Sequence, residues 1–288
     1  MRRRSKKMYL LYLPAIIMLF VFVIRPFGET LYISLCKWNG YSSEKKFIGI
    51  ENYLTILQDG RFQTALINTL IYGFASTILQ NVIGLSAALF VNSKFKGNGI
   101  VRIIIYLPIM ISGLIMGYIM YFFFTYDRGV LNDILKWFGA EPVDWLANGK
   151  YGVLIITLIN SWQYAGNCMV IYLAGIQNIP KLYVEAATID GAGKWQCFKN
   201  ITLPLLVPAM TTSVIVNLIG GLKLFDPIIS LTNGGPGYQT HSLMTYLNTQ
   251  YFLKEKAGYA SAIGIFTFVL IMVVAVIANG YFEKKMVE

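Results

Sequence analysis

The sequence predicts an all-α integral membrane protein, one transmembrane domain over residues 1–288 with about six transmembrane helices. Hydrophobic residues make up 56% of the chain and charged residues only 13%, whereas charged residues are roughly 25% of an average soluble domain. The apolar residues gather into uncharged runs that are long enough to cross roughly 30 Å of hydrocarbon at about 1.5 Å per residue. Composition and run length together therefore predict a multi-pass membrane protein.

Six apolar runs are predicted as spans. They lie near 8–26, 65–92, 101–124, 153–175, 204–222 and 258–282. The basic start MRRRSKK before the first run imitates a signal peptide, but Arg25-Pro26-Phe27 follows where small residues would mark a cleavage site. The first run is therefore interpreted as an uncleaved span. The fifth run gives the weakest prediction of a span, because it carries Asn217, Gly220 and Gly221.

The distribution of basic residues predicts the orientation. The first seven residues carry five of the 24 lysines and arginines, and the short loop 93–99 adds Lys94 and Lys96. Basic residues concentrate on the cytoplasmic side of membrane proteins, so both termini and segment 176–203 are predicted to be cytoplasmic. The net charge of +10 is then explained by cytoplasmic loops facing lipid headgroups, and no nucleic-acid partner is expected.

The residues that usually carry catalysis or bind metals are scarce. His241 is the single histidine, and Cys36, Cys168 and Cys197 are widely spaced, so we expect no catalytic residues, no metal site and no disulfide framework. Residues 191–194 read Gly-Ala-Gly-Lys, but Trp195 follows where a P-loop requires serine or threonine. No nucleotide or cofactor site is expected in this chain.

Segment 176–203 is polar and interrupted by glycines. Pro180 ends the continuation of the fourth span because proline lacks the N–H that a helix needs. Residues 182–189 predict about two helical turns, and Asp190-Gly191-Ala192-Gly193 predicts the turn that ends them. Such a helix, exposed beyond the bilayer, would be a docking surface for another protein. The alternative is an ordinary helix lying on the membrane surface.

The spacing within this segment is more specific than its composition. Glu185-Ala186-Ala187 is followed by a glycine six residues after Glu185, and Ile201 and Leu203-Pro204 close the motif. This pattern resembles the EAA loop of permease subunits of ABC importers. Further matches include FIGIENY at 47–53, YLP at 106–108, DRGVLN at 127–132, YLAGIQNIP at 172–180 and LFDPIISLTNGGPG at 224–237.

Together these motifs resemble the carbohydrate-importing, maltose-permease-F-like family. The chain departs from the maltose permease itself, which has extra spans and a large periplasmic insertion. It also reads Tyr183-Val184 where Leu-Tyr is usual before Glu185.

The resemblance implies the type I permease fold of ABC importers and a coupling helix in the cytoplasmic loop. The coupling residues are then Glu185, Ala186, Ala187, Asp190, Gly191 and Ala192. It also implies three protein partners in a bacterial plasma (inner) membrane: a second homologous permease subunit, a cytoplasmic ATPase dimer that carries ATP and magnesium, and an extracellular or periplasmic substrate-binding protein. This chain would be a transport subunit, not an enzyme, embedded in lipid.

Several polar residues interrupt the fourth and fifth spans. Asn160, Gln163, Tyr164 and Asn167 recur at helical spacing and so share one face. Amides within hydrocarbon usually face protein or a cavity, and hydrogen bonding between helices is the alternative to substrate binding. The resemblance implies sugar contacts at five of the six candidate positions, all but Gln163. The candidate substrate-binding residues are Asn160, Gln163, Tyr164, Asn167, Asn217 and Gly221.

The predicted function is ATP-driven import of a sugar or oligosaccharide by alternating access. One alternative is the same architecture with a non-sugar solute, such as glycerol phosphate or an amino acid. A secondary carrier is the other alternative, but carriers of that kind usually need carboxylates within the membrane, and the six predicted spans contain none.

Overall fold

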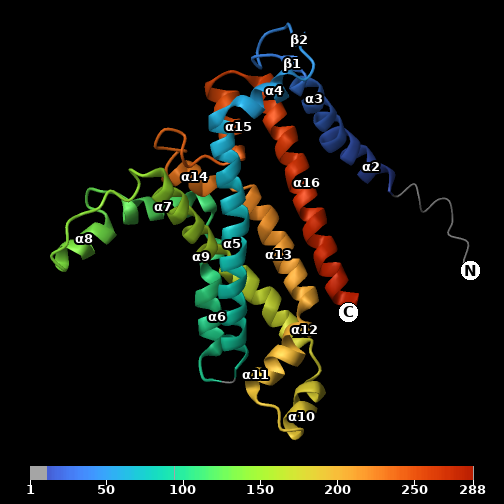
Figure 1. Ribbon diagram of the computed structural model, residues 1–288, viewed down its shortest axis with the longest axis vertical. Coiled ribbons are helices and arrows are strands. Elements are labelled where there is room, and N and C mark those ends of the chain that lie inside the picture. Colours follow the sequence, from blue (N-terminus) through green and yellow to red (C-terminus); the bar gives the residue numbers. More distant parts are fainter. Residues whose placement is uncertain (1–11, 94, 288) are drawn as a thin grey trace, which may run out of the picture. The chain divides into compact units, whose positions relative to one another are not determined.

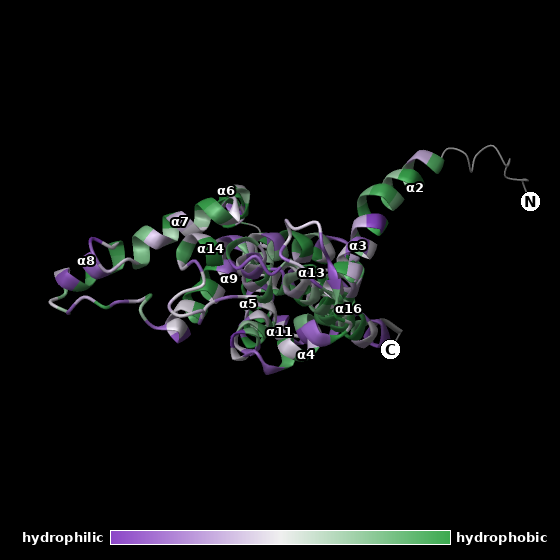
Figure 2. Cartoon of the chain, turned by 90° about the horizontal axis from the view of Figure 1, so that it is seen from above, coloured by the Kyte–Doolittle hydropathy of each residue, from purple (hydrophilic) through white to green (hydrophobic). Residues whose placement is uncertain are grey.

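The computed structural model describes residues 12–93 and 95–287, and it is predominantly helical (Figure 1). Contacts divide the chain into two units, which are described separately. One unit combines residues up to Asp59 with Leu247–Val269, and the other combines Gly60–Tyr246 with the chain from Leu270 onward. Helix α2 is mainly hydrophobic along its length (Figure 2), as expected of a membrane-embedded helix.

The first unit begins with one continuous helical run. It consists of α2 (Leu13–Leu19), the π-helical turn η1 (Phe20–Ile24) and α3 (Arg25–Ser34). The helix continues through Pro26 to Ser34, eight residues beyond the predicted end of the first span near 26. Proline cannot donate to the carbonyl four residues earlier, and the π-helical turn just before it changes the hydrogen-bonding register there. Residues 8–11 of the predicted span lie outside the described residues.

The rest of this unit consists mainly of short strands and helices. They are β1 (Cys36–Lys37), β2 (Lys46–Phe47), α4 (Glu51–Gln58), η4 (Thr249–Leu253) and the start of α16 (Ala257–Val287). The strands pair antiparallel, with Cys36 opposite Phe47. The buried amide of Asn52 donates to the carbonyls of Ser34 at 2.8 Å and Cys36 at 3.0 Å. One side chain on α4 therefore supplies hydrogen bonds to backbone carbonyls at and just after the C-terminal end of α3, which lack partners within the helix.

The second unit contains most of the helices. They are α5 (Gly60–Asn92), α6 (Asn98–Tyr106), η2 (Leu107–Met110), α7 (Gly113–Phe124), α8 (Val130–Trp137), α9 (Gly149–Gln177), α10 (Lys181–Ile189), α11 (Lys194–Cys197), η3 (Phe198–Thr202), α12 (Leu203–Leu205), α13 (Val207–Leu222), α14 (Asp226–Leu231) and the beginning of α15 (Leu243–Asn248). The helix predicted over residues 182–189 is observed as α10.

Two core clusters set the directions of α5 and α9. One contains Tyr72 with residues of α9 from Val153 to Ile159, and the other contains Ala88 with residues from Cys168 to Leu173. From the first cluster to the second, the residue numbers increase on both helices, so α5 and α9 run in the same direction. Close contacts are made at glycines, where helix backbones can approach. A Cβ added at Gly84 would lie 2.3 Å from the Cβ of Cys168.

Length and composition allow up to five membrane crossings within the described residues. Three are single helices: Leu13–Ser34, Gly60–Asn92 and Ala257–Lys285. Two more are bent pairs, Asn98–Met110 with Gly113–Phe124 at 98° and Lys194–Leu205 with Val207–Leu222 at 65°. The predicted third and fifth spans are therefore not straight helices. The predicted fourth span lies within α9, which is long enough but falls outside this set; its amides at 160, 163 and 167 lower its hydropathy.

Proline and backbone conformation explain the two bends. Pro108 lies in the first turn of η2, and Ile111 is extended at φ −84° and ψ 132° before Ser112 begins α7. In the fifth span, Pro208 cannot donate to the carbonyl of Pro204, so the helix bends between them, at Leu206.

Candidate functional site

Helix α10 ends in a well-defined turn at Gly191. The backbone there has φ +86°, a left-handed conformation that side chains with a Cβ rarely adopt. The N–H of Ala192 donates to the carbonyl of Ala187 at 2.9 Å, and the N–H of Gly191 donates to that of Thr188 at 3.1 Å. This pair of bonds is a Schellman motif. A Cβ added at Gly191 would meet no atom within 4 Å, so the glycine is required by conformation and not by space.

The surface of α10 is largely uncovered by the rest of the chain. It has no buried residue, and three large apolar side chains on α10 and α11 are strongly exposed: Leu182 at 71%, Ile189 at 86% and Trp195 at 71%. Of the predicted coupling residues, Glu185, Ala186, Asp190 and Gly191 are exposed, and Ala187 and Ala192 are half-buried. The structure therefore brings the predicted set together on one exposed helix and turn.

The chain returns from this turn to α13 through α11, η3 and α12. Cys197 is buried, and the rings of Trp195 and Phe198 lie 5.4 Å apart. Leu206, at the 65° bend, is fully buried. A Cβ added at Gly175 of α9 would lie 2.9 Å from the side chain of Leu206, so the bend packs against α9. The short elements α11, η3 and α12 therefore connect α10 directly to α13.

The predicted polar face of α9 divides into buried and accessible residues. Asn160 and Gln163 are buried. The side-chain amide of Gln163 donates to the carbonyl of Ile111 at 2.8 Å, and Gln80 of α5 donates to the backbone carbonyl of Asn160 at 3.1 Å. Both positions thus take part in contacts between helices of this chain.

Asn217 and Gly221 of α13 are also buried against neighbouring helices. The amide of Asn217 donates to the carbonyl of Ser213 at 2.7 Å and to the sulfur of Cys168 at 3.2 Å. A Cβ added at Gly221 would lie 2.6 Å from the carbonyl oxygen of Tyr72. These contacts hold α13 against α5 and α9.

Tyr164 and Asn167 are the accessible members of the predicted face. Both are half-buried, and neither side chain has a hydrogen-bond partner within residues 12–93 and 95–287. The carboxylate of Asp226 interacts electrostatically with the Tyr164 hydroxyl. Polar groups that lack a partner within the chain are available to a substrate or a second subunit.

Sequence reasoning missed several members of a polar cluster between α5, α9 and α13. The hydroxyl of Tyr172 donates to Asn81 at 2.7 Å. Within the described part of the chain, four buried side-chain atoms have no partner: Thr77 Oγ1, Gln80 Oε1, Gln163 Oε1 and Ser213 Oγ. Spacing could have indicated two of these residues, because Thr77 and Ser213 each lie four residues before an asparagine, on the same helical face.

The segment between α14 and α15 is fixed by side chains of α5. Asn68 donates to the carbonyls of Gln239 at 2.7 Å and His241 at 3.0 Å, and Tyr72 donates to that of Thr240 at 2.9 Å. Burial lowers the pKa of His241 to about 4. Asn233 and Gly234 within this segment have positive φ, at 47° and 80°. Hydrogen bonds from α5 therefore hold this segment against the helix.

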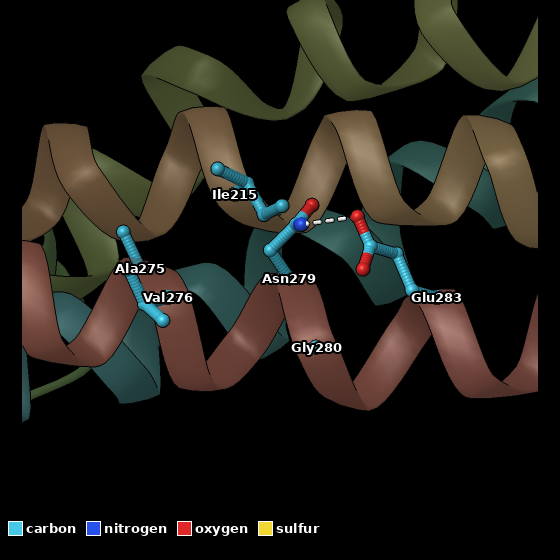
Figure 3. A pocket seen from close by; sticks show the side chains of 6 residues that line it. All are labelled: Ile215, Ala275, Val276, Asn279, Gly280 and Glu283. Carbon is cyan, nitrogen blue, oxygen red and sulfur yellow. Dashed lines mark hydrogen bonds between the residues drawn. The ribbon is translucent and has the colours of Figure 1, made fainter.

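A groove of about 440 Å³ lies between α13 and α16 (Figure 3). Its lining residues are Ile215, Ala275, Val276, Asn279, Gly280 and Glu283, and Asn279 donates to Glu283 at 2.7 Å. Ile215 and Asn217 are two residues apart on α13 and point to opposite sides. The groove is therefore separate from the predicted substrate-binding face.

Comparison with known proteins identifies the family. Residues 80–288 match the family described as "Binding-protein-dependent transport system inner membrane component". The chain belongs to this family. The match includes α10, the Gly191 turn and the polar residues of α9 and α13.

Curated relatives of this family member cover nearly the whole chain. It is 37% identical over 270 residues to the trehalose/maltose transport system permease protein MalF of Thermococcus litoralis, covering 94% of this chain and 91% of that protein. It is 35% identical over 277 residues to the probable starch degradation products transport system permease protein AmyD of Thermoanaerobacterium thermosulfurigenes, covering 96% and 93%.

Solved structures of family members share the fold. A chain of a bacterial ABC transporter that imports the acidic polysaccharide alginate matches with a TM-score of 0.84 and 28% identity, covering 98% of this chain and 96% of that chain. A chain of the alginate transporter in complex with an alginate pentasaccharide-bound periplasmic protein gives 0.85 and 27%, covering 99% and 96%. The predicted resemblance to sugar ABC importer permeases and the predicted fold class are confirmed. The chain is a multi-pass membrane transport subunit of a system that works with a binding protein.

Proposed function

We propose that this chain is one of two homologous transmembrane subunits of a bacterial importer that moves an uncharged sugar or oligosaccharide by alternating access. A separate ATPase dimer would bind ATP and magnesium on the cytoplasmic side, where both termini of this chain lie. A binding protein would deliver the sugar from outside. The names of MalF and AmyD support a sugar substrate.

The observation that carries this proposal is the exposed helix α10 with its Schellman turn. Leu182, Ile189 and Trp195 present apolar surface away from the chain, as expected of a helix that docks into a groove of another protein. ATP binding would close the ATPase dimer and move α10, and the segment through Leu206 would pass that movement to α13. ATP drives transport only if it binds one conformation better than the other.

The polar residues support a neutral substrate. No lysine or arginine occurs between Lys150 and Lys181 on α9, or between Lys199 and Lys223 on the run into α13. The accessible groups are Tyr164 and Asn167, whose hydroxyl and amide suit sugar hydroxyls. A phosphate or uronate would need cations, so glycerol phosphate and acidic oligosaccharides are the less suitable substrates. Asn160, Gln163, Asn217 and Gly221 would support this face from the protein interior.

The test is ATP hydrolysis by the reconstituted importer with its binding protein. Glu185→Lys should abolish the stimulation of ATPase activity by sugar-loaded binding protein, because it reverses a charge on the docking helix. Glu141→Lys, the same change on an exposed acid outside the cytoplasmic loop, is the matched control and should retain the stimulation. Equal stimulation in both variants would contradict the proposed coupling role of α10.

A further inference from the structure

Helix α8 exposes a row of large apolar side chains. Val130 is 39% exposed, Ile134 41%, Trp137 87% and Phe138 84%. Their spacing of four, seven and eight residues places them on one arc of about 100° around the helix axis. We call this arc the α8 apolar face. Figure 2 shows both hydrophilic and hydrophobic residues on this helix.

The opposite side of α8 is fixed to the protein by a buried asparagine. Asn132 is fully buried, and its side chain donates to the carbonyls of Tyr126 at 3.1 Å and Val143 at 3.0 Å. Its carbonyl oxygen accepts from the N–H of Val143 and the indole of Trp145, both at 3.0 Å. Because turning the apolar face towards the rest of this chain would require breaking these bonds, the fold itself keeps this face directed outward.

The third side of α8 is polar and electrically balanced. Asp133 and Lys136 form an exposed ion pair at 3.5 Å. The helix thus has one side on the protein, one polar side and one apolar side. A helix needs these three surfaces where protein, water and lipid meet.

The position of α7 along α5 indicates the depth of α7 in the bilayer, and α8 follows α7 in the chain. Tyr72 of α5 and Met116 of α7 belong to the same core cluster. Tyr72 precedes Asn92, the end of α5, by 20 residues, a rise of about 30 Å, and the hydrocarbon core is roughly 30 Å thick. Helix α7 bends by 98° from the preceding segment Asn98–Met110 and runs sideways from α5 towards α8 (Figure 1). It therefore lies near the membrane boundary opposite the Asn92 end.

We propose that the α8 apolar face is a lipid anchor that inserts between the headgroups and acyl chains of the outer leaflet. Helix α7 is apolar throughout and has exposed residues such as Tyr118 and Phe122, so lipid contact there continues directly onto α8. Tryptophan is enriched at this depth of membranes. The inference rests on the orientation in the proposed function, in which the Asn92 end is cytoplasmic.

The test is lipid accessibility of spin labels in the assembled importer in phospholipid nanodiscs. Trp137→Cys places the label on the α8 apolar face, and Lys136→Cys places it on the polar side of the same turn. Cys36, Cys168 and Cys197 are buried, and the unsubstituted chain serves as the labelling blank. We expect the ratio of oxygen to nickel-chelate collision rates to be severalfold higher at 137 than at 136.

Two results would overturn the anchor. Equal ratios at both positions would show that the face is in water, and protection of 137 from both reagents would show that another protein covers it. Trp137→Phe provides a second measurement, since it keeps the ring: quenching of tryptophan fluorescence by lipids brominated near the headgroup should fall relative to the unsubstituted chain. Neither measurement depends on ATP hydrolysis, so the anchor and the coupling role of α10 fail independently.

Discussion

The side chain of Gln163 on α9 donates to the carbonyl of Ile111, 2.8 Å away, at the break between η2 and α7. Ile111 is extended, so its carbonyl is outside any helical ladder. Pro108 lies just before it and favours the break. One buried amide thus compensates for the backbone interruption that turns the predicted third span by 98°.

Gln163→Ala is expected to destabilise the subunit. The substitution leaves the Ile111 carbonyl without its partner and opens a small cavity, and a lost partner at a buried polar group costs about 1–3 kcal/mol. The measurement is the thermal melting temperature of the purified importer in detergent. Gln177→Ala, the same change at the exposed end of α9, is the control. A melting temperature that falls equally in both variants would contradict a special role for the bond.

Gly191 is expected to tolerate side chains in the order that backbone conformation dictates. Its φ of +86° with open space around it disfavours β-branched residues most and asparagine least. Gly191→Val should therefore abolish sugar-stimulated ATP hydrolysis by the importer, and Gly191→Asn should retain much of it. The measurement is stimulated ATPase activity at matched complex yield.

Gly97 provides the matched control for this series. It also has positive φ, +93°, and also has no neighbour within 4 Å of an added Cβ. It lies in the 93–99 loop, directly before α6, and is not part of the α10 segment. If Gly97→Val uncoupled ATP hydrolysis as strongly as Gly191→Val, general strain in the loops would explain the loss and the coupling role would be wrong.

The sequence was sufficient to predict those elements that depend on residues close together in the chain. The apolar run at 65–92, the loop helix near 182–189 and the turn at Gly191 were all predicted, because apolar content, proline and glycine act over a few residues. The break at Ile111 was missed because its stabilising partner, Gln163, is 52 residues away. The same limit applies to the polar face of α9, where residues of equal chemistry are either buried against α5 or left accessible.

The difference between the buried and the accessible residues of the α9 polar face leads to a prediction on substrate selectivity. Asn167→Ala and Tyr164→Phe should each reduce sugar affinity about three- to tenfold, because one neutral hydrogen bond is worth about 0.5–1.5 kcal/mol. The size of the reduction should differ between sugars, since each sugar presents its hydroxyls differently. The measurement is uptake of several sugars into proteoliposomes, normalised to complex yield.

Asn217→Ala provides the contrast. It removes the buried bonds to Ser213 and Cys168, so it should lower complex yield and affect every sugar alike. If Asn167→Ala and Tyr164→Phe also gave uniform losses that follow complex yield, these residues would be assigned to helix packing.

His241 lies between α14 and α15, outside the candidate spans, among aromatic rings. Its ring is 5.2 Å from that of Tyr238 and 6.1 Å from that of Tyr246, and Nδ1 is 2.9 Å from the hydroxyl of Thr245. The guanidinium of Arg61 lies over the ring of Tyr238. Burial is the main cause of its pKa of about 4.

The low pKa of His241 predicts loss of stability in mild acid. The unfolded chain, with an ordinary histidine pKa near 6.5, binds more protons than the folded chain between pH 4 and 6.5. The free energy of unfolding therefore rises with pH through this window and is constant above it. At pH 5 the loss relative to pH 7.5 is on the order of 2 kcal/mol. The melting temperature should fall less between these pH values in His241→Gln than in the unsubstituted chain, because glutamine does not titrate and all other groups are shared. Parallel melting curves for the two proteins would show that His241 is not kept neutral by its surroundings.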